Sequence, residues 1–168
     1  PNIIGIARGT GGGRSLMLNA HMDTVGVAGM DRPHDPFVQD NRLYGRGAYD
    51  MKGGLAAIMA AAAVARQRNL RGDVIVTAVV DEEYASIGTG SVVKRWLADA
   101  AIVTEPTELN ICVAHKGFIW LEVETTGIAA HGSRPDLGID AIAKMGKVLV
   151  GLEKLDQSLR SVPSHRLL

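Results

Sequence analysis

The chain has 168 residues, enough for one domain or two small ones, and its 46% hydrophobic content is sufficient for a packed core. Its 18 Lys and Arg residues balance 18 Asp and Glu residues, and no basic patch is interleaved with aromatic residues, which argues against binding to nucleic acid or an anionic membrane. No apolar run reaches the ~18 residues of a membrane span. The single cysteine, Cys112, suits a reducing compartment, so we expect a cytoplasmic protein.

The first half of the chain predicts strands followed by a helix. Residues 2–7 and 16–20 predict a pair of strands joined by the glycine-rich turn at 9–13. Residues 24–41 predict a long loop, because Gly, Asp and Pro recur in them. The alanine-rich residues 53–68 predict a helix that is apolar nearly all round, and such a helix should be buried against a sheet.

Two further strands are predicted at residues 74–80 and 100–104, with a helix at about 90–97 between them. Helices that alternate with nearly continuous apolar strands indicate a largely parallel sheet covered on both faces. The predicted fold class is therefore α/β, with a mixed, largely parallel sheet flanked by helices.

The pattern changes in the last third of the chain. Residues 118–125 alternate like a one-sided strand, and after a loop the residues 138–159 have helical spacing. We therefore predict two domains, residues 1–116 and the start of a smaller α+β domain at 117–168. Because both ends of the chain look cut, we expect it to be a piece of a longer protein.

Acidic or imidazole side chains stand where four strand-like runs stop. The carboxyl ends of parallel strands meet at one edge of a sheet, so these side chains should converge there. Carboxylates gathered around a histidine are what a divalent metal ion requires. The predicted cluster consists of His21, Asp50, Glu82, Glu83 and Glu105.

Taken alone, each motif also has an ordinary structural interpretation. Asp50 could cap the following helix, residues 81–83 could form a solvated turn, and Glu105 before a proline indicates little. A loop histidine such as His131 is usually only solvated. The interpretation as one site rests on the joint occurrence of the motifs. Glycines around Asp50 also favour close backbone packing; they are Gly45, Gly47, Gly53 and Gly54.

The paired glutamates have a specific chemical interpretation. Neighbouring residues at a strand end point in opposite directions, so Glu83 can bind metal while Glu82 faces a substrate. A partly buried carboxylate near other carboxylates has a raised pKa, as a general base working near neutral pH needs. Asp23, close to His21, can accept the other ring N–H and fix its tautomer.

These motifs, in this order, resemble the M20 family of zinc-dependent metallopeptidases and amidohydrolases, which includes acetylornithine deacetylase, succinyl-diaminopimelate desuccinylase, aminoacylase-1 and the glutamate carboxypeptidases. The match runs along nearly the whole chain. It comprises residues 18–23, 35–37, 43–54, 81–83, 104–107, 116–117 and 130–135.

The resemblance implies two Zn²⁺ ions, for which Co²⁺ or Mn²⁺ could substitute, bridged by Asp50. His21 and Glu105 would hold one ion, and Glu83 with a further histidine would hold the other. Asp23 would orient His21, and Glu82 would be the general base. The smaller domain would be a lid through which the full-length enzyme forms a homodimer, and its His131 would hold the substrate and its oxyanion.

Two features depart from the family pattern. The histidine that completes the second metal site is expected after Leu168, and His165 is in the wrong place to replace it. The tryptophan usual just before residues 35–37 is also missing.

The implied function is hydrolysis of an amide bond in an N-acyl amino acid or a small peptide, through a hydroxide held between two zinc ions. The alternative is a non-catalytic metal-binding or assembly module, and the 168-residue chain itself is expected to be inactive. A metallophosphatase is disfavoured, because no basic cluster for phosphate accompanies the motifs.

Overall fold

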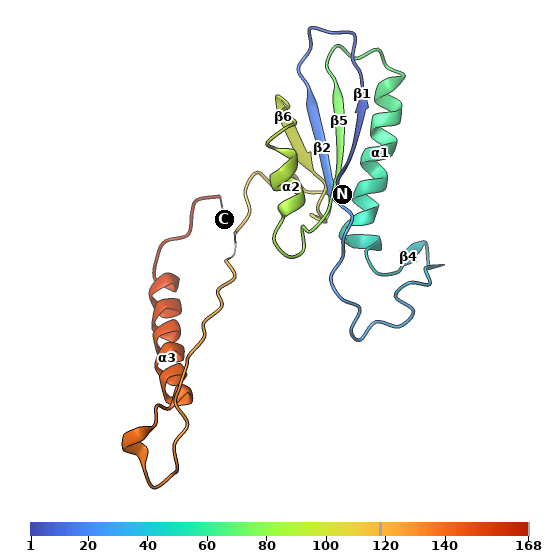
Figure 1. Cartoon of the computed structure of the whole chain (residues 1–168). Helices are drawn as coiled ribbons and strands as arrows, with labels where there is room; N and C mark the ends of the chain where they lie inside the picture. The colour runs from blue at the N-terminus through green and yellow to red at the C-terminus, as the bar shows by residue number, and fades with distance from the viewer. Residues whose placement is uncertain (118, 168) are drawn as a thin grey trace. The chain divides into compact units, whose positions relative to one another are not determined.

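The computed structural model describes residues 1–117 and 119–167 and contains two compact units, Pro1–Ile111 and Cys112–Leu168. The first unit holds a four-stranded sheet and the second a long helix (Figure 1). This division falls a few residues before the boundary between residues 116 and 117 that the sequence predicts.

The central sheet of the first unit has the strand order β1-β5-β2-β6. Strand β2 is parallel to both β5 and β6, whereas β1 is antiparallel to β5. The predicted mixed, largely parallel sheet is therefore confirmed. The strands are β1 (Ile3–Ala7), β2 (Leu16–His21), β5 (Val74–Val79) and β6 (Ala100–Val103).

Helices cover both faces of the sheet, because successive side chains of a strand point to opposite sides. Leu18 on β2 packs with Ile58 of α1 (Gly53–Arg66) in one apolar core. The preceding Met17 packs with Val92 of α2 (Ile87–Val92) in a second core on the other face. Figure 1 shows the sheet between these helices.

The predicted pairing of the first two strands is wrong, because β5 lies between β1 and β2. Strand β2 is buried along nearly its whole length, whereas β1 is partly exposed, so β2 takes the central position and β1 an edge. The glycine-rich turn reaches across the sheet end instead. Its Thr10 and Gly11 donate backbone hydrogen bonds to the carbonyl groups of Leu70 and Arg71.

The predicted long loop, residues 24–41, contains β3 (Phe37–Gln39), which forms a short antiparallel hairpin with β4 (Arg42–Tyr44) just after the loop. Its turn residues Asp40 and Asn41 both have positive φ, 49° and 59°, as a two-residue hairpin turn of the primed type requires. The rings of Phe37 and Tyr44 stack with centroids 5.0 Å apart. Strands of three residues are too short to show the period by which strands are predicted.

The two predicted helices of the first unit are present, but the burial of one and the bounds of the other differ from the prediction. The alanine-rich helix α1 is confirmed, but the expected burial all round is wrong: only Ile58 is buried, and Met59 is 60% exposed. The sheet covers only one side of α1, so the side chains on the opposite side of this helix remain exposed. The second helix begins at Ile87, before the predicted residue 90, and its regular part ends at Val92.

In the second unit the predicted helix is confirmed as α3 (Ala141–Arg160), which Asp140 caps by accepting bonds from the N–H groups of Ile142 and Ala143. The predicted strand at 118–125 begins on Phe118, outside the described residues, and residues 119–125 do not form a strand. A strand needs a partner, and the isolated bridge between Ile128 and Ile139 does not supply one. None of the described helices is long and apolar enough to cross a membrane.

Two glycine-to-alanine substitutions should have opposite effects. A Cβ added at Gly54, in the first turn of α1, would lie 2.4 Å from the Thr104 carbonyl oxygen, so Gly54→Ala should destabilise the first unit by about 1–3 kcal/mol. A Cβ at Gly146, inside α3, would meet nothing within 4 Å, so Gly146→Ala should stabilise α3 by up to about 1 kcal/mol. Thermal unfolding followed by circular dichroism measures both effects. Equal shifts in the same direction would contradict the close approach at Gly54.

Candidate metal centre

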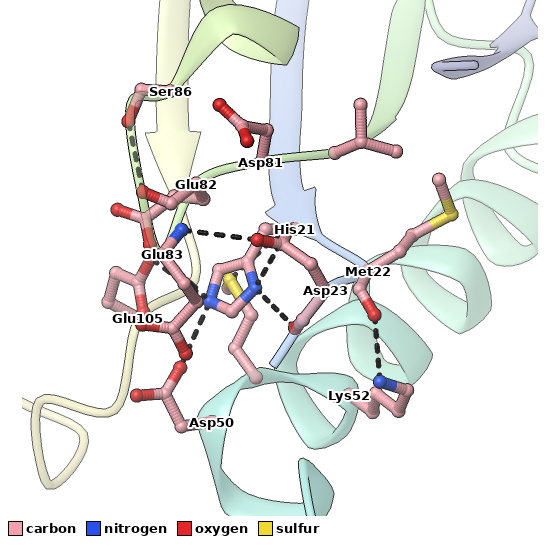
Figure 2. Close-up of polar contacts among 12 residues, drawn as sticks. His21, Met22, Asp23, Asp50, Lys52, Asp81, Glu82, Glu83, Ser86 and Glu105 are labelled. Carbon is pink, nitrogen blue, oxygen red and sulfur yellow. Dashed lines mark hydrogen bonds and ion pairs between the residues drawn. The ribbon is translucent and has the colours of Figure 1, made fainter. Parts of the chain in front are cut away.

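The candidate site lies where three parallel strands end. His21 is the last residue of β2, Glu82 and Glu83 follow β5, and Glu105 follows β6. Asp50 comes from the turn η1 (Ala48–Lys52) immediately before α1. Figure 2 shows these side chains gathered around the His21 ring, so the structure brings together the five residues that the sequence places at one edge.

His21 is the centre of the cluster, and its side chain is only 1% exposed. Its Nδ1 lies 2.9 Å from the backbone oxygen of Asp23 and its Nε2 lies 3.0 Å from Oδ1 of Asp50. Carboxylate oxygens of Glu82 and Glu105 lie 3.8 and 3.9 Å from the same Nε2. One ring nitrogen is thus fixed by the backbone, and the other faces three carboxylates.

This geometry determines which nitrogen is available. A carbonyl oxygen only accepts hydrogen bonds, so Nδ1 must carry a hydrogen and donate it to Asp23. In a neutral ring, Nε2 would then direct a lone pair at the Asp50 carboxylate, which is repulsive unless a proton or a cation lies between them. The donor set therefore fits a divalent cation at the position that a proton occupies in its absence.

The pKa of His21 follows the same balance. Burial favours the neutral ring, but the hydrogen bonds to the Asp23 carbonyl and the Asp50 carboxylate outweigh it. The negative charges of Glu105 and Glu82 act in the same direction. Together they raise the pKa of His21 above its ordinary value.

Burial, followed by the neighbouring carboxylates, raises the pKa values of Glu82 and Glu105 despite the opposing charge of His21. Within residues 1–117 and 119–167, His21 is the only basic side chain in ion-pair distance of Asp50, Glu82 or Glu105. The cluster therefore has an excess of negative charge that a bound cation would compensate.

Two groups of side chains are close enough to share an ion. His21, Glu82 and Glu105 form one group, and His21, Asp50 and Glu83 form the other. In each group, one possible ligand atom from every residue lies within 4.8 Å of the others. The five predicted cluster residues therefore all offer an atom to one group or the other.

The backbone around Asp50 explains how this carboxylate reaches His21. Asp50 does not cap the helix, because α1 begins at Gly53 and no side-chain cap bond is formed. Gly47 precedes the turn with φ 78°, and a Cβ there would lie 2.6 Å from Thr24 Cγ2. A non-glycine residue could not pack this closely, which supports the predicted role of the glycines.

Asp23 contacts both halves of the site. Its carbonyl, rather than its carboxylate, accepts the His21 Nδ1 hydrogen bond, since carboxylate Oδ1 lies 3.6 Å from Nδ1. Carboxylate Oδ2 instead accepts the N–H of Glu83 at 3.2 Å. Burial raises the pKa of Asp23, but backbone N–H groups, those of Glu83 and Glu82 first, outweigh it and hold the pKa below its ordinary value.

His131 belongs to the second unit, whereas the cluster lies in the first. It is exposed, and its Nδ1 lies 2.9 Å from the hydroxyl oxygen of Ser133, which supplies or accepts a hydrogen according to the tautomer. The role that the resemblance implies for His131 stays a prediction.

The sequence did not predict three residues that support the site. Met51 is fully buried, and its Sδ lies 3.2 Å from the backbone nitrogen of His21, which donates to it. Asn19 donates to the hydroxyl of Thr77 at 2.8 Å inside the sheet. Polar residues in two apolar runs could have indicated the second contact, but nothing in the sequence indicates the first.

Comparison with known proteins agrees with this geometry. Residues 17–160 match the model of peptidase family M20/M25/M40. The chain belongs to this family. As an M20 chain it is 37% identical over 165 residues to acetylornithine deacetylase of Myxococcus xanthus, covering 92% of this chain and 41% of that protein. It is 34% identical over 184 residues to N-formyl-4-amino-5-aminomethyl-2-methylpyrimidine deformylase of Bacillus subtilis, covering 98% and 43%.

A solved structure shares the fold of the M20 chain. It is a tripeptidase from Staphylococcus aureus, with a TM-score of 0.59, 22% identity and coverage of 89% of this chain and 42% of that one. At this identity the likeness shows the fold alone. The M20 chain spans about 40% of the length of the two curated relatives above.

The raised pKa of His21 predicts how stability depends on pH. Without metal, its protonation stabilises the folded state fully below about pH 6.5, and this contribution is lost as pH rises through the higher pKa of the folded state. Stability of the metal-free chain should therefore fall as the pH rises above about 6.5, whereas affinity for a divalent ion should rise. Denaturant unfolding with chelator and with added Zn²⁺ measures both. A metal-free stability that rises over this range would contradict the assignment.

Proposed function

We propose that the whole protein hydrolyses an amide bond in an N-acyl amino acid or a short peptide. The observation that carries the proposal is the buried His21 with carboxylates converging on its Nε2 at the edge of the sheet. Its curated relatives include a deacetylase and a deformylase, both named for the removal of an acyl group.

We propose that the bound cation is zinc, held by His21, Asp50, Glu83 and Glu105. Asp50 would be common to two ions, and a further histidine would complete the second position. When bound, zinc polarises a carbonyl group and lowers the pKa of a water molecule, which is the chemistry that amide hydrolysis needs. The excess negative charge of the cluster supports a bound cation, and the two groups of possible ligands together include all four of these residues.

The general base in this proposal is Glu82. Its side chain is 39% exposed, so water can reach it, while burial and the nearby carboxylates raise its pKa toward neutral pH. Its carboxylate would take the proton from the attacking water and pass it to the leaving amine. Asp23 would hold the His21 ring by its carbonyl and the backbone of Glu83 by its carboxylate.

The second unit supplies the remaining parts of the proposal. His131 would contact the oxyanion of the substrate, a contribution commonly worth a few kcal/mol. A homodimer formed through this unit is supported by exposed apolar side chains on α3, such as Ile142 at 84% and Leu149 at 58% exposure.

The proposal is tested by incubating the full-length protein with a panel of N-acyl amino acids and short peptides. Release of a free amine should require a divalent ion, stop with chelator and return when Zn²⁺ is added. Tight metal binding without hydrolysis of any member of the panel would favour the non-catalytic alternative.

Glu82→Gln should lower kcat by about 100-fold or more, because the amide cannot accept the proton from water. Metal content should remain that of the parent, as elemental analysis measures. Glu108→Gln, an exposed residue near Glu105 but outside the cluster, is the matched control and should change neither quantity. An oxygen of Glu82 is also a possible ligand atom, so loss of metal from Glu82→Gln would show that Glu82 is a ligand.

Asp50→Ala should remove both metal ions, since Asp50 is the ligand proposed to be common to them. Glu105→Ala should weaken mainly one. The matched control is Asp31→Ala, an exposed aspartate outside the cluster. Equilibrium dialysis against Zn²⁺ distinguishes these outcomes, and an Asp50→Ala protein that retains two ions per chain would rule out the shared ligand.

A further inference from the structure

The segment that carries Glu82 and Glu83 is a loop closed at its base. It connects β5 to α2, and the two ends meet where a Cβ added at Gly88 would lie 2.2 Å from the Val80 carbonyl oxygen. Asn2 ties these ends together, because its amide donates to the Gly88 carbonyl at 2.8 Å and accepts from the Val80 N–H at 3.1 Å. Because both ends of the loop are fixed, the path of the chain between them depends on the backbone angles of the residues inside the loop.

Asp81 follows Val80 in this loop and has a left-handed backbone, with φ 64°. Its carbonyl accepts hydrogen bonds from the backbone N–H groups of Ser86, at 2.6 Å, and Ala85, at 3.2 Å. Its carboxylate makes only a long contact of 3.4 Å with the N–H of Ile87, the first residue of α2. Figure 2 shows this carboxylate directed away from His21, so Asp81 does not join the cluster.

The left-handed turn at Asp81 sets the direction of the two glutamates that follow. Immediately after it, Glu82 comes within 3.8 Å of His21 Nε2, and the N–H of Glu83 reaches the Asp23 carboxylate at 3.2 Å. A change of φ to the ordinary negative region would rotate the chain beyond Asp81 and break the bonds that close the loop at its carbonyl.

We propose that Asp81 is a positioning residue for the metal centre, and that it acts through its left-handed backbone rather than through its charge. The inference rests on the proposed function and adds a specific requirement to it. Aspartate, asparagine and glycine adopt positive φ readily, whereas a β-branched residue is strongly disfavoured there. The residue type at position 81 thus matters because it determines whether the backbone can adopt a positive φ at that position. Glu82 and Glu83 come after this turn and cannot impose it.

The experiment compares Asp81→Asn, Asp81→Gly, Asp81→Ala and Asp81→Val in the full chain. Asp40 supplies the matched control, because it also has a positive φ, 49°, but lies in the β3–β4 turn and outside the cluster. Asp40→Val and Asp40→Ala carry the same backbone penalty without touching the site. Affinity for Zn²⁺ is measured by competition with a chelator, the absorption of bound Co²⁺ reports ligand geometry, and thermal unfolding reports stability.

Asp81→Asn and Asp81→Gly should bind Zn²⁺ within about 3-fold of the parent, and Asp81→Val about 10-fold or more weaker with a changed Co²⁺ spectrum. Asp81→Ala should lie between them and serves where the valine variant does not fold. The Asp40 variants should lose stability but keep the parent affinity and spectrum.

Two results would overturn the inference but not the proposed function. In the first, Asp81→Val has the same Zn²⁺ affinity and Co²⁺ spectrum as Asp40→Val. In the second, Asp81→Gly and Asp81→Asn bind Zn²⁺ as weakly as Asp81→Val does. A parent chain that binds neither Zn²⁺ nor Co²⁺ would overturn the proposed function together with the inference.

Discussion

The mutual repulsion of carboxylates at one edge of the sheet is the constraint on which the rest of this structure depends. Burial and like charges disfavour ionisation of Glu82 and Glu105, and among the described residues only His21 offers them an opposing charge. Such an arrangement is unfavourable, and it persists in the folded state only if the backbone holds the side chains in place. Here β2, β5 and β6 supply that backbone, since their parallel register brings three chain segments to the same edge.

The contacts that hold the cluster are mainly those of the main chain. The His21 ring is fixed by a carbonyl, the Glu83 N–H is fixed by the Asp23 carboxylate, and the turn before α1 depends on Gly47. Lys52 adds a bond from its ammonium group to the Met22 carbonyl, which joins this turn to the end of β2. Because these contacts use Nδ1 and the backbone, the Nε2 of His21 can face the carboxylates and lies 3.0 Å from Oδ1 of Asp50.

The site could be predicted from the sequence because the apolar runs of β2, β5 and β6 end so sharply before polar residues. That signal is local. Because parallel strands end at a common edge of the sheet, it also predicts where in the fold these polar residues lie. The partner of β1 could not be predicted, because adjacency in the chain does not decide which strand lies deepest in the sheet. The hairpin of β3 and β4 was too short to show a period, and residues 119–125 have strand-like alternation without a strand to pair with.

The buried ring of His21 and the carboxylates around it differ in their exposure to solvent. The ring is enclosed and held at Nδ1, whereas half of the Asp50 side chain and about a third of the Glu105 side chain remain accessible to solvent. The cluster thus combines one enclosed nitrogen donor, held at Nδ1, with oxygen donors that remain accessible to solvent. Were the proposed cation bound, accessible oxygen donors would allow ions of different radius, because fewer packed neighbours fix the positions of these oxygens. Selection between metals would then be made by their supply rather than by the cavity.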